Sequence, residues 1–349
     1  MRLILESDPN PMKGLQSLLF LTISVHSFAQ SQPALTRIAF GSCSNEELQD
    51  EMWTEIASQK PQLCILLGDN IYGDTHDMTW MRTQYDQQKN LPGYQLLLKT
   101  SRMIGTWDDH DYGRNDGGKF YTKRRESKEE FMRFMDIPDD DPIRRHDGIY
   151  SSHTFGPPGK QVKVILLDLR YFRDTTIRST IPGRRYDPNP EGDMMGEEQW
   201  AWFENELKNS SADVHIIGSS IQLISNDHYW EKWGNFPKSR QRMFDLLVRY
   251  GPKNVVVISG DRHVAEISKI ELPGLPKPLY DVTSSGLTHT WNTRDGSMPP
   301  DEKNSNRVGR LIVQKNYGLI LIDWVAKDPV ITFEIRGQGN AVWDKLVVR

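Results

Sequence analysis

The stretch Leu63-Cys64-Ile65-Leu66-Leu67-Gly68-Asp69-Asn70-Ile71-Tyr72 joins an apolar run to a polar turn. The apolar run has the length and composition of a buried strand, and the glycine after it allows the chain to turn sharply. Asp69 then follows directly after the strand. In α/β proteins, ligands gather where loops leave the carboxyl ends of the strands. The stretch therefore predicts a polar pocket at one edge of a sheet.

Three other stretches repeat this arrangement of an apolar run followed by polar side chains. They are Arg37–Phe40 before Gly41-Ser42-Cys43, Met103–Thr106 before Trp107-Asp108-Asp109-His110-Asp111, and Val255–Ile258 before Ser259-Gly260-Asp261-Arg262-His263. One such loop carries little information. Four that converge on one sheet edge would assemble a pocket of Asp, His, Cys and Tyr side chains, so we predict an α/β fold with a metal site at the strand ends.

Helical patterns separate these strands. Asn45 to Gln59 has apolar residues at helical spacing, with Asn45 as a candidate N-cap, and Lys123 to Met135 forms a second amphipathic stretch. Further apolar runs at 162–167 and 214–217 predict buried strands. No repeat, low-complexity tract or linker divides the chain, so we predict a single domain over residues 30–349.

The amino terminus has the pattern of a secretory signal peptide. Met12-Lys13 precedes an apolar run from Leu15 to Val25, and small residues lead to a cleavage point after Ala29. The run is too short to span a bilayer. Residues 1–11 carry two acidic side chains, which do not suit the start of a signal peptide, so we take Met12 as the true start. We expect an exported protein, periplasmic or secreted, without a stable membrane anchor.

Composition excludes some partners. The 349 residues carry a formal net charge of -4, which gives no general electrostatic reason to bind nucleic acid or an anionic membrane. The only two cysteines are Cys43 and Cys64. Because Cys64 lies in a buried run, we expect a free buried thiol rather than a disulfide. The chain also lacks a Gly-x-Ser-x-Gly elbow, a P-loop, a Gly-x-Gly-x-x-Gly fingerprint and a His-Glu-x-x-His helix.

The polar loops carry chemistry suited to cations. Neighbouring carboxylates, as in Asp108-Asp109-His110-Asp111, raise one another's pKa unless a cation neutralises them. Asp261 and His263 are two residues apart, so in extended backbone they face the same side and could bind one ion. His110 has two candidate roles, as a metal ligand or as a proton donor to a leaving alkoxide.

The donor types indicate a mixed site. The thiolate of Cys43 and the phenolate of Tyr72 suit ferric iron better than magnesium or calcium. The oxygen donors of Asp69, Asp109 and Asn115 suit harder ions. We therefore predict one iron together with one or more divalent ions, with Asp69 able to bridge two cations.

Taken in order, the loops resemble a known family. The shared motifs are Gly41-Ser42-Cys43, Gly-Asp-x-Ile-Tyr at 68–72, Trp-Asp-Asp-His at 107–110, Leu-Asp-x-Arg-x-x-Arg at 167–173 and Gly-Asp-Arg-His at 260–263. These motifs look like those of the PhoD-like alkaline phosphatases, which belong to the calcineurin-like metallophosphoesterases. The resemblance implies a four-layer αββα sandwich with the metal site at the carboxyl ends of the strands, and hydrolysis of phosphate monoesters or diesters outside the cytoplasm.

The resemblance also implies roles for individual residues. Iron, Fe(3+), would be held by Cys43, Asp69, Tyr72 and Asp261. Calcium, Ca(2+), would be held by Asp69, Asp109, Asn115 and His263, with other divalent metals as alternatives, and His110 would lie beside the phosphate. The chain departs from the family at Asn70, Gly73 and Asp111, and it has no histidine near 219–222. These departures bear on substrate preference more than on metal binding.

The substrate side of the site stays open. Arg170 and Arg173 could neutralise phosphate oxygens, or could pair with Asp168 and Asp174. Gln222 could also face the site.

Our leading hypothesis is an exported alkaline phosphatase D type phosphoesterase. A metal-activated hydroxide would attack a phosphorylated small molecule or phosphodiester, with His110 and Asp109 as catalytic residues and the protein acting as a monomer. One alternative is a phosphodiesterase or phospholipase-D-type hydrolase using the same site. Another is a non-catalytic secreted protein that binds glycan through aromatic residues. Its candidates are Tyr229, Trp230 and Trp233.

Overall fold

The computed structural model of this chain describes residues 33–48, 51–292, 302–326 and 328–349. The predicted signal peptide over residues 1–29 and the predicted start at Met12 lie outside these ranges. Export and the domain limits at 30 and 349 therefore remain predictions. Among the helices of the described ranges, none combines the length and the apolar character needed to cross a membrane.

Strands and helices alternate along most of the described chain. The strands are β1 Arg37–Gly41, β2 Leu63–Leu67, β3 Arg102–Thr106, β4 Ser151–Phe155, β5 Val162–Leu166, β6 Ile177–Arg178, β7 Tyr186–Asp187, β8 Val214–Gly218, β9 Val255–Ser259, β10 Ala265–Ile270, β11 Leu279–Ser284, β12 Tyr317–Asp323, β13 Val330–Arg336 and β14 Val342–Val348. The α-helices are α1 Met52–Ser58, α2 Met78–Asn90, α3 Pro92–Thr100, α4 Asp109–Tyr112, α5 Arg124–Phe134, α6 Gly196–Lys208 and α7 Pro237–Tyr250, with short 3-10 turns at Pro142–Arg145, Trp233–Asn235 and Gln338–Asn340.

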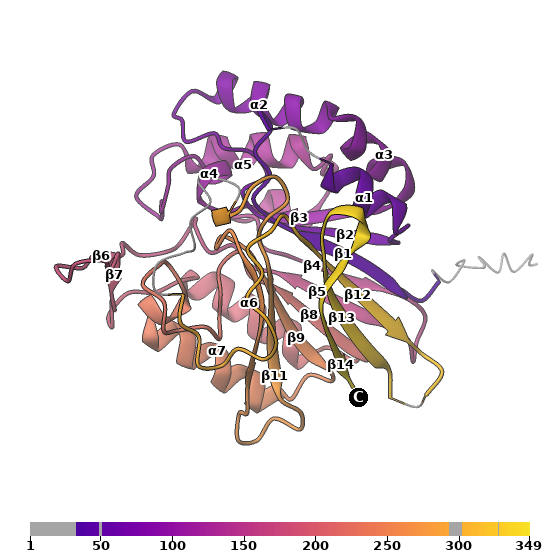
Figure 1. The fold of residues 1–349 in the computed structure, drawn as a ribbon. Helices are drawn as coiled ribbons and strands as arrows, with labels where there is room; N and C mark the ends of the chain where they lie inside the picture. Colours follow the sequence, from indigo (N-terminus) through magenta and orange to yellow (C-terminus); the bar gives the residue numbers. More distant parts are fainter. Residues whose placement is uncertain (1–32, 49–50, 293–301, 327) are drawn as a thin grey trace, which may run out of the picture. The chain divides into compact units, whose positions relative to one another are not determined.

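Two six-stranded sheets form the centre of the fold (Figure 1). The first has the strand order β14-β13-β12-β1-β2-β3, and the second has the order β10-β11-β9-β8-β5-β4. Within the first sheet β1, β2 and β3 run parallel. Within the second, β5, β8, β9 and β11 run parallel. Several carboxyl strand ends in each sheet are therefore available to carry a site.

Side-chain alternation produces four layers. Ile38 and Phe40 of β1 lie in the core between the sheets, where they join Ile216 of β8. The intervening Ala39 belongs to a second core that contains Trp53 of α1. Successive strand residues point to opposite faces, so each buried strand contributes to two cores.

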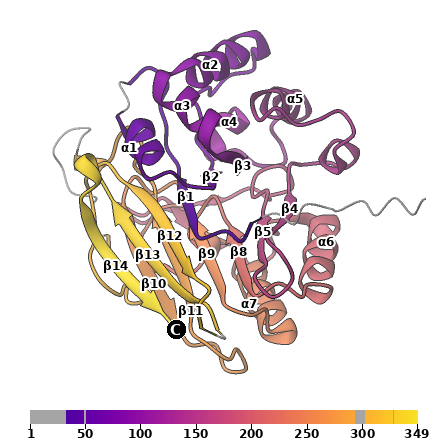
Figure 2. The same cartoon turned by 90° about the vertical axis from the view of Figure 1, so that its right-hand side faces the viewer.

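The second sheet is covered on its other face by α6 and α7 (Figure 2). Its outer core includes Ile165 of β5, Trp200 of α6 and Met243 of α7. Helices α1 to α5 cover the first sheet in the same way. The layers are thus helices, sheet, sheet and helices, which confirms the predicted four-layer αββα sandwich.

One predicted helix was too long. The pattern from Asn45 to Gln59 indicated a helix capped by Asn45, but α1 begins at Met52. The Asn45 side-chain oxygen instead accepts a hydrogen bond from the backbone N–H of Glu47 at 2.9 Å, and the backbone N–H of Asn45 donates to Thr288 Oγ1 at 2.8 Å. These contacts hold the chain after β1 in a turn, so the helix forms only farther along.

The cysteines behave as predicted. Both Cys43 and Cys64 are buried free thiols.

His215, on β8, is a core residue whose hydrogen-bonding groups are satisfied, because its ring nitrogens lie 2.9 Å from Lys253 O and 2.7 Å from Ser210 Oγ.

Truncation of the core between the sheets tests the layer assignment. Ile216 is fully buried, so Ile216→Ala should lower the free energy of unfolding by about 2–5 kcal/mol through lost burial and a residual cavity. Val325 is 92% exposed, and Val325→Ala should change stability by less than about 0.5 kcal/mol. Equilibrium denaturation measures both. Equal effects of the two substitutions would contradict the assignment.

Candidate metal centre

The four polar loops follow the carboxyl ends of β1, β2, β3 and β9 and meet at one edge of the sandwich. Backbone hydrogen bonds join the first two loops, because Ser44 N donates to Asp69 O at 2.8 Å and Cys43 N donates to Gly68 O at 3.3 Å. A fifth loop, after β11, joins them through Thr288 N, which donates to Cys43 O at 3.2 Å. The parallel direction of the strands within each sheet is what allows these loops to share one edge.

Donor atoms from these loops form overlapping groups. Within each group, one candidate ligand atom per residue lies within 4.8 Å of the others. The groups are Cys43, Asp69 and His263; Asp69, Asp109 and His110; Asp69, Asp108, Asp109 and Asp261; and Asp109, Asp116 and Glu231. Asp69 belongs to three of the four, which suits a carboxylate that bridges two cations.

At the centre, Asp69 and Asp261 are short of positive partners, whereas the charges of His110 and Arg170 outweigh burial and lower the pKa of Asp109. Asp69 and Asp109 are each 1% exposed. Burial, followed by the repulsion of neighbouring carboxylates, raises the pKa of Asp69 and of Asp261 well above the usual range. Burial and the charge of Asp69 likewise raise the pKa of the Cys43 thiol. Each of these groups gains from a nearby cation.

One carboxylate oxygen of Asp109 lacks a hydrogen-bond partner. Its Oδ1 is buried and has no hydrogen-bond partner among the residues that the structure describes. An unpaired buried carboxylate oxygen is costly in a protein interior. Since a carboxylate oxygen of Asp109 also lies within 4.8 Å of donor atoms of Asp69 and His110, the residues present fit a cluster of bound cations.

Backbone strain accompanies the donors. Cys43, Asp69, Asp261 and His263 have φ angles of 62°, 50°, 67° and 56°. The left-handed region costs about 1–2 kcal/mol for a residue with a side chain. Such residues persist only where the surroundings hold them, and they concentrate at functional sites. The strain therefore indicates that the loops are constrained to direct these side chains toward one another.

Asp111 belongs to none of these donor groups. It connects the loops after β2 and β3 through hydrogen bonds. Its Oδ1 accepts hydrogen bonds from Asp69 N at 3.1 Å and from Asp108 N at 2.7 Å. Its Oδ2 accepts from the backbone and side-chain nitrogens of Asn70, at 3.1 and 2.5 Å. Asn70, one of the departures from the family pattern, thus belongs to the scaffold that orients Asp69.

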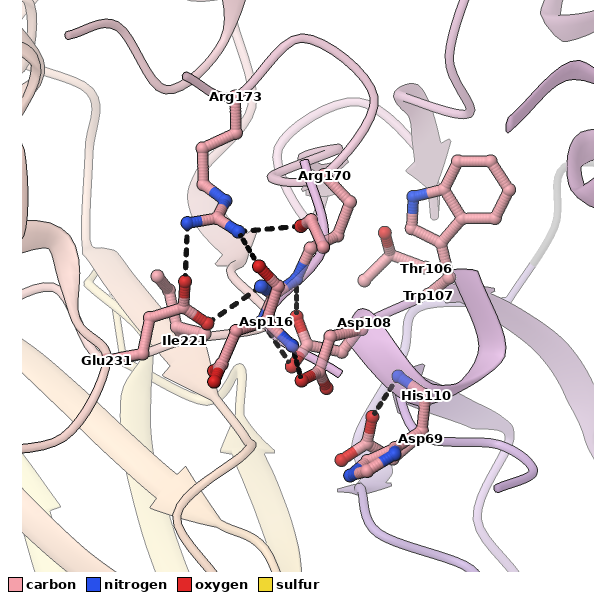
Figure 3. A network of polar contacts seen from close by, with 12 residues as sticks. Asp69, Thr106, Trp107, Asp108, His110, Asp116, Arg170, Arg173, Ile221 and Glu231 are labelled. Carbon is pink, nitrogen blue, oxygen red and sulfur yellow. Dashed lines mark hydrogen bonds and ion pairs between the residues drawn. The ribbon is translucent and has the colours of Figure 1, made fainter. Parts of the chain in front are cut away.

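A buried network of ion pairs lies beside the donors (Figure 3). Arg170 donates two hydrogen bonds to Asp108, at 2.7 and 2.8 Å, and a third guanidinium nitrogen lies 2.7 Å from Glu231 Oε2. Arg173 lies 2.6 Å from the other Glu231 oxygen and donates to Asp116 O at 2.6 Å. Both arginines are at most 1% exposed, so the network joins the loop after β3 to the segment around Glu231.

The predicted substrate residues lie outside the cavity lining. In this network the side chains of Arg170 and Arg173 pair with Asp108 and Glu231, not with the predicted partners Asp168 and Asp174. Gln222 is fully buried, and its side-chain nitrogen donates to Glu266 at 2.8 Å and to Thr283 at 2.9 Å. These contacts favour structural roles for all three.

His110 lies at the edge of the donor groups. Its Nδ1 is 2.5 Å from Asp74 Oδ2, and its ring packs against Tyr72 with centroids 4.3 Å apart. Burial alone lowers the pKa of His110, but the carboxylates of Asp109 and Asp74 outweigh burial and raise that pKa to about 10. The imidazole is therefore held as a cation at neutral pH, and a cation bound to Asp109 would offset part of this shift.

Two other predicted ligands contact the donors. The hydroxyl of Tyr72 lies 3.1 Å from His263 Nε2. Asn115 Nδ2 donates to Asp109 Oδ2 at 2.8 Å, and its oxygen accepts from Arg185 at 3.2 Å. Every residue predicted to bind metal thus lies in, or hydrogen-bonds to, the same set of donor groups.

A cavity of about 760 Å³ opens in front of the donors. Its lining includes Tyr72, Asp74, His110, Asn115, Asp261 and His263, and also residues that the sequence did not indicate as part of a site, namely Asp116, Arg185, Glu231, His289 and Trp291. Of the predicted aromatic group, Trp230 lines the cavity whereas Trp233 is buried in a core.

The sequence did not indicate His289, because no metal-binding or catalytic motif surrounds it. Its ring centroid nevertheless lies 4.5 Å from that of His263 and 5.1 Å from that of Tyr72. The signal that could have found it is topological. β11 runs parallel to β9, so the loop after β11 emerges at the same edge as the loop that carries His263.

A methyl group at Gly68 should disrupt the centre. Gly68 has a φ of 97°, and an added Cβ would lie 2.4 Å from Asp108 Cβ and 2.5 Å from Asp108 N. Gly68→Ala should therefore lower both the bound metal per chain and the melting temperature.

Gly159 provides the matched control for this substitution. Its φ is 82°, but an added Cβ there would meet no atom within 4 Å. Gly159→Ala should cost about 1 kcal/mol of stability through its backbone conformation alone and leave metal content unchanged. Equal metal loss in both variants would contradict the steric argument.

Metal removal should destabilise the protein more at high pH. In the metal-free fold, the raised pKa values of Asp69 and Asp261 mean that the folded state keeps protons that the unfolded chain releases above about pH 4. The folded state then binds more protons than the unfolded state, so its stability falls as pH rises. Since bound cations replace those protons, the melting-temperature gap between metal-loaded and chelator-treated protein should widen from about pH 5 to pH 8. A gap that narrows would contradict this account.

Comparison with known proteins places the chain in a family. A model of the family described as PhoD-like phosphatase matches residues 38–316. The chain is 24% identical over 285 residues to alkaline phosphatase D of Bacillus subtilis (strain 168), a match that covers 69% of this chain and 48% of that protein. The chain thus spans about half the length of this curated relative.

Solved structures share the fold. The structure of PhoD matches with a TM-score of 0.72 and 18% identity, over 91% of this chain and 70% of that one. A dimetal phosphatase from Danio rerio matches with a TM-score of 0.54 and 10% identity, over 90% of this chain and 99% of that one. At these identities the likeness concerns the fold. Because the family model covers most of its length, this chain belongs to the PhoD-like phosphatase family.

Proposed function

We propose that this protein is an exported, metal-dependent phosphoesterase that hydrolyses phosphate monoesters, diesters or both. One observation carries the proposal, namely the grouping of Cys43, Asp69, Asp109, Asp261 and His263 around common points at the strand ends. Family membership and the name of the Bacillus subtilis relative support it. Export rests on the sequence pattern of residues 12–29.

The proposed metal ligands form two sets that share Asp69. Cys43, Asp69, Tyr72 and Asp261 would hold ferric iron, and Asp69, Asp109, Asn115 and His263 would hold calcium or another divalent ion. The anionic thiolate and phenolate donors of the first set suit ferric iron better than calcium or magnesium. When bound, such cations neutralise phosphate charge and lower the pKa of a water molecule. A colourless protein with zinc alone and full activity would overturn the iron assignment and leave the hydrolase intact.

His110 is the proposed proton donor. Asp74 holds the imidazole by its Nδ1, and the carboxylates of Asp109 and Asp74 raise the pKa of His110, which favours its protonated form. A protonated imidazole beside the phosphate can donate to the oxygen of the leaving alcohol, which would otherwise depart as an alkoxide. Asp109, hydrogen-bonded to Asn115 and Asp116, would act as a fixed ligand in the same site.

The ion pairs around Glu231 would position the site without touching the substrate. Arg170 donates two hydrogen bonds to Asp108, the residue before Asp109. A guanidinium that binds both carboxylate oxygens restricts their orientation. The network thereby holds the loop after β3 in place for metal binding.

Two alternatives remain as rivals. A phosphodiesterase or phospholipase-D-type hydrolase would use the same groups, and activity toward nitrophenyl mono- and bis-esters distinguishes it from a monoesterase. A non-catalytic glycan-binding protein would have no need for buried carboxylates that face one another at a cavity.

Replacing Asp69 tests the proposal. Asp69→Asn keeps the shape of the side chain but removes the charge that three donor groups share, so kcat on the preferred nitrophenyl ester should fall by at least about 100-fold. Asp245 is exposed on α7, and Asp245→Asn should leave kcat unchanged. If the metal-loaded protein cleaves neither ester, or if Asp69→Asn retains full turnover, the proposal is wrong.

A further inference from the structure

Two tryptophans form one wall of the cavity. Trp230 and Trp291 both line it and both are half-buried. Their ring centroids lie 5.1 Å apart and their planes are inclined by 52°. The two indole rings therefore form a corner with two apolar surfaces, against which a third ring can pack.

This corner is attached to the loop that carries two candidate metal ligands. Trp291 Nε1 donates to Arg262 O at 3.1 Å, and Trp291 N donates to His263 O at 3.3 Å. Arg262 lies between Asp261 and His263 in the chain. A molecule with its phosphate at the donor groups would thus have its remaining atoms next to the corner.

The charges around Trp230 favour a neutral ring over a cation. The guanidinium carbons of Arg262 and Arg185 lie 5.5 and 5.7 Å from the Trp230 ring centroid. Arg262 is paired with Glu302 at 2.5 Å, and Arg185 is paired with Asp116, so both guanidinium groups are held in place. An ammonium head group would meet like charge there, whereas a planar ring can pack on indole and guanidinium surfaces alike.

The volume of the cavity is sufficient for a substrate that carries a planar ring. Its volume, about 760 Å³, lies within the range typical of sites that enclose whole small molecules, about 300–1,000 Å³. A phosphate group alone needs only a small part of that space. The rest is available to the alcohol portion of a substrate.

We propose that the preferred substrates carry a planar aromatic or heteroaromatic ring in their alcohol portion, and that this ring packs in the corner of Trp230 and Trp291. The inference rests on the proposed phosphoesterase function and adds a substrate class to it. Packing of one planar base on an aromatic side chain typically changes binding by roughly 5- to 160-fold.

A matched pair of substrates isolates the ring. Adenosine 5′-monophosphate and ribose 5-phosphate share the phosphate and the primary alcohol that leaves, and the first adds a heteroaromatic ring. We expect the metal-loaded protein to prefer the first by roughly tenfold or more in kcat/KM. If only diesters are cleaved, the methyl esters of the same two compounds serve as the pair.

Variants of the corner should change this preference. Trp291→Ala and Trp230→Ala should each bring the kcat/KM ratio close to one, and Trp291→Phe should keep part of it. Trp80 is 48% exposed on α2 and lies outside the cavity lining, so Trp80→Ala should leave the ratio unchanged.

Other results would contradict either the substrate inference or the proposed function. Equal kcat/KM for both substrates, or a higher value for phosphocholine than for either, would overturn the inference while the phosphoesterase stands. Equal loss on both substrates in the corner variants would also overturn it, because the tryptophans would then only support the loop of Arg262. No cleavage of these compounds or of nitrophenyl esters would instead refute the proposed function itself.

Discussion

The concentration of buried negative charge at one edge of the sandwich is the constraint on which this structure depends. Asp108 and Glu231 are matched by Arg170 and Arg173 at 2.6–2.7 Å. Asp69 and Asp261 have no Lys or Arg side chain at ion-pair distance among the described residues, whereas His110, Arg170 and hydrogen bonds from Asn115 and Asp116 outweigh burial and lower the pKa of Asp109. A fold that buries carboxylates without partners loses stability unless something neutralises them. Protons can do so, at a raised pKa, and bound cations can do so at neutral pH.

Strained loops, and hydrogen bonds between these loops, hold the charged side chains in position. Residues at positive φ lie at the ends of β1, β2 and β9, and Asp111 ties the loops after β2 and β3 together. The hydrophobic cores between and outside the sheets hold the strands from which these loops leave. Stability of the scaffold and arrangement of the site are thus separate, because the apolar layers fix the strand ends while the polar contacts direct the side chains.

Much of the fold was readable from the sequence. Runs such as 63–67 and 255–258 are apolar on both faces, which is how a strand between a helix layer and a second sheet must appear. The carboxyl ends of such strands then identify Cys43, Asp69 and His263 as neighbours, because parallel strands bring distant segments to one edge. The helix at Asn45 was overextended because a tertiary contact with Thr288 outweighed local helical spacing.

The remainder of the site depended on long-range contacts. Glu231 lies in an irregular segment with no periodic pattern, so its pairing with two arginines could not be inferred from spacing. The same holds for Trp291, whose place at the cavity follows from hydrogen bonds to Arg262 and His263. The substrate roles considered for Arg170 and Arg173 reflected their charge alone, because burial became visible only in three dimensions.

The central claim is that loops far apart in sequence share one cluster of cations, and metal analysis tests it most directly. Protein purified without chelator, and quantified by elemental analysis together with its visible spectrum, should contain at least two equivalents of tightly held metal per chain. Fully active protein that retains less than one equivalent after purification, with no metal required in the assay, would contradict the account.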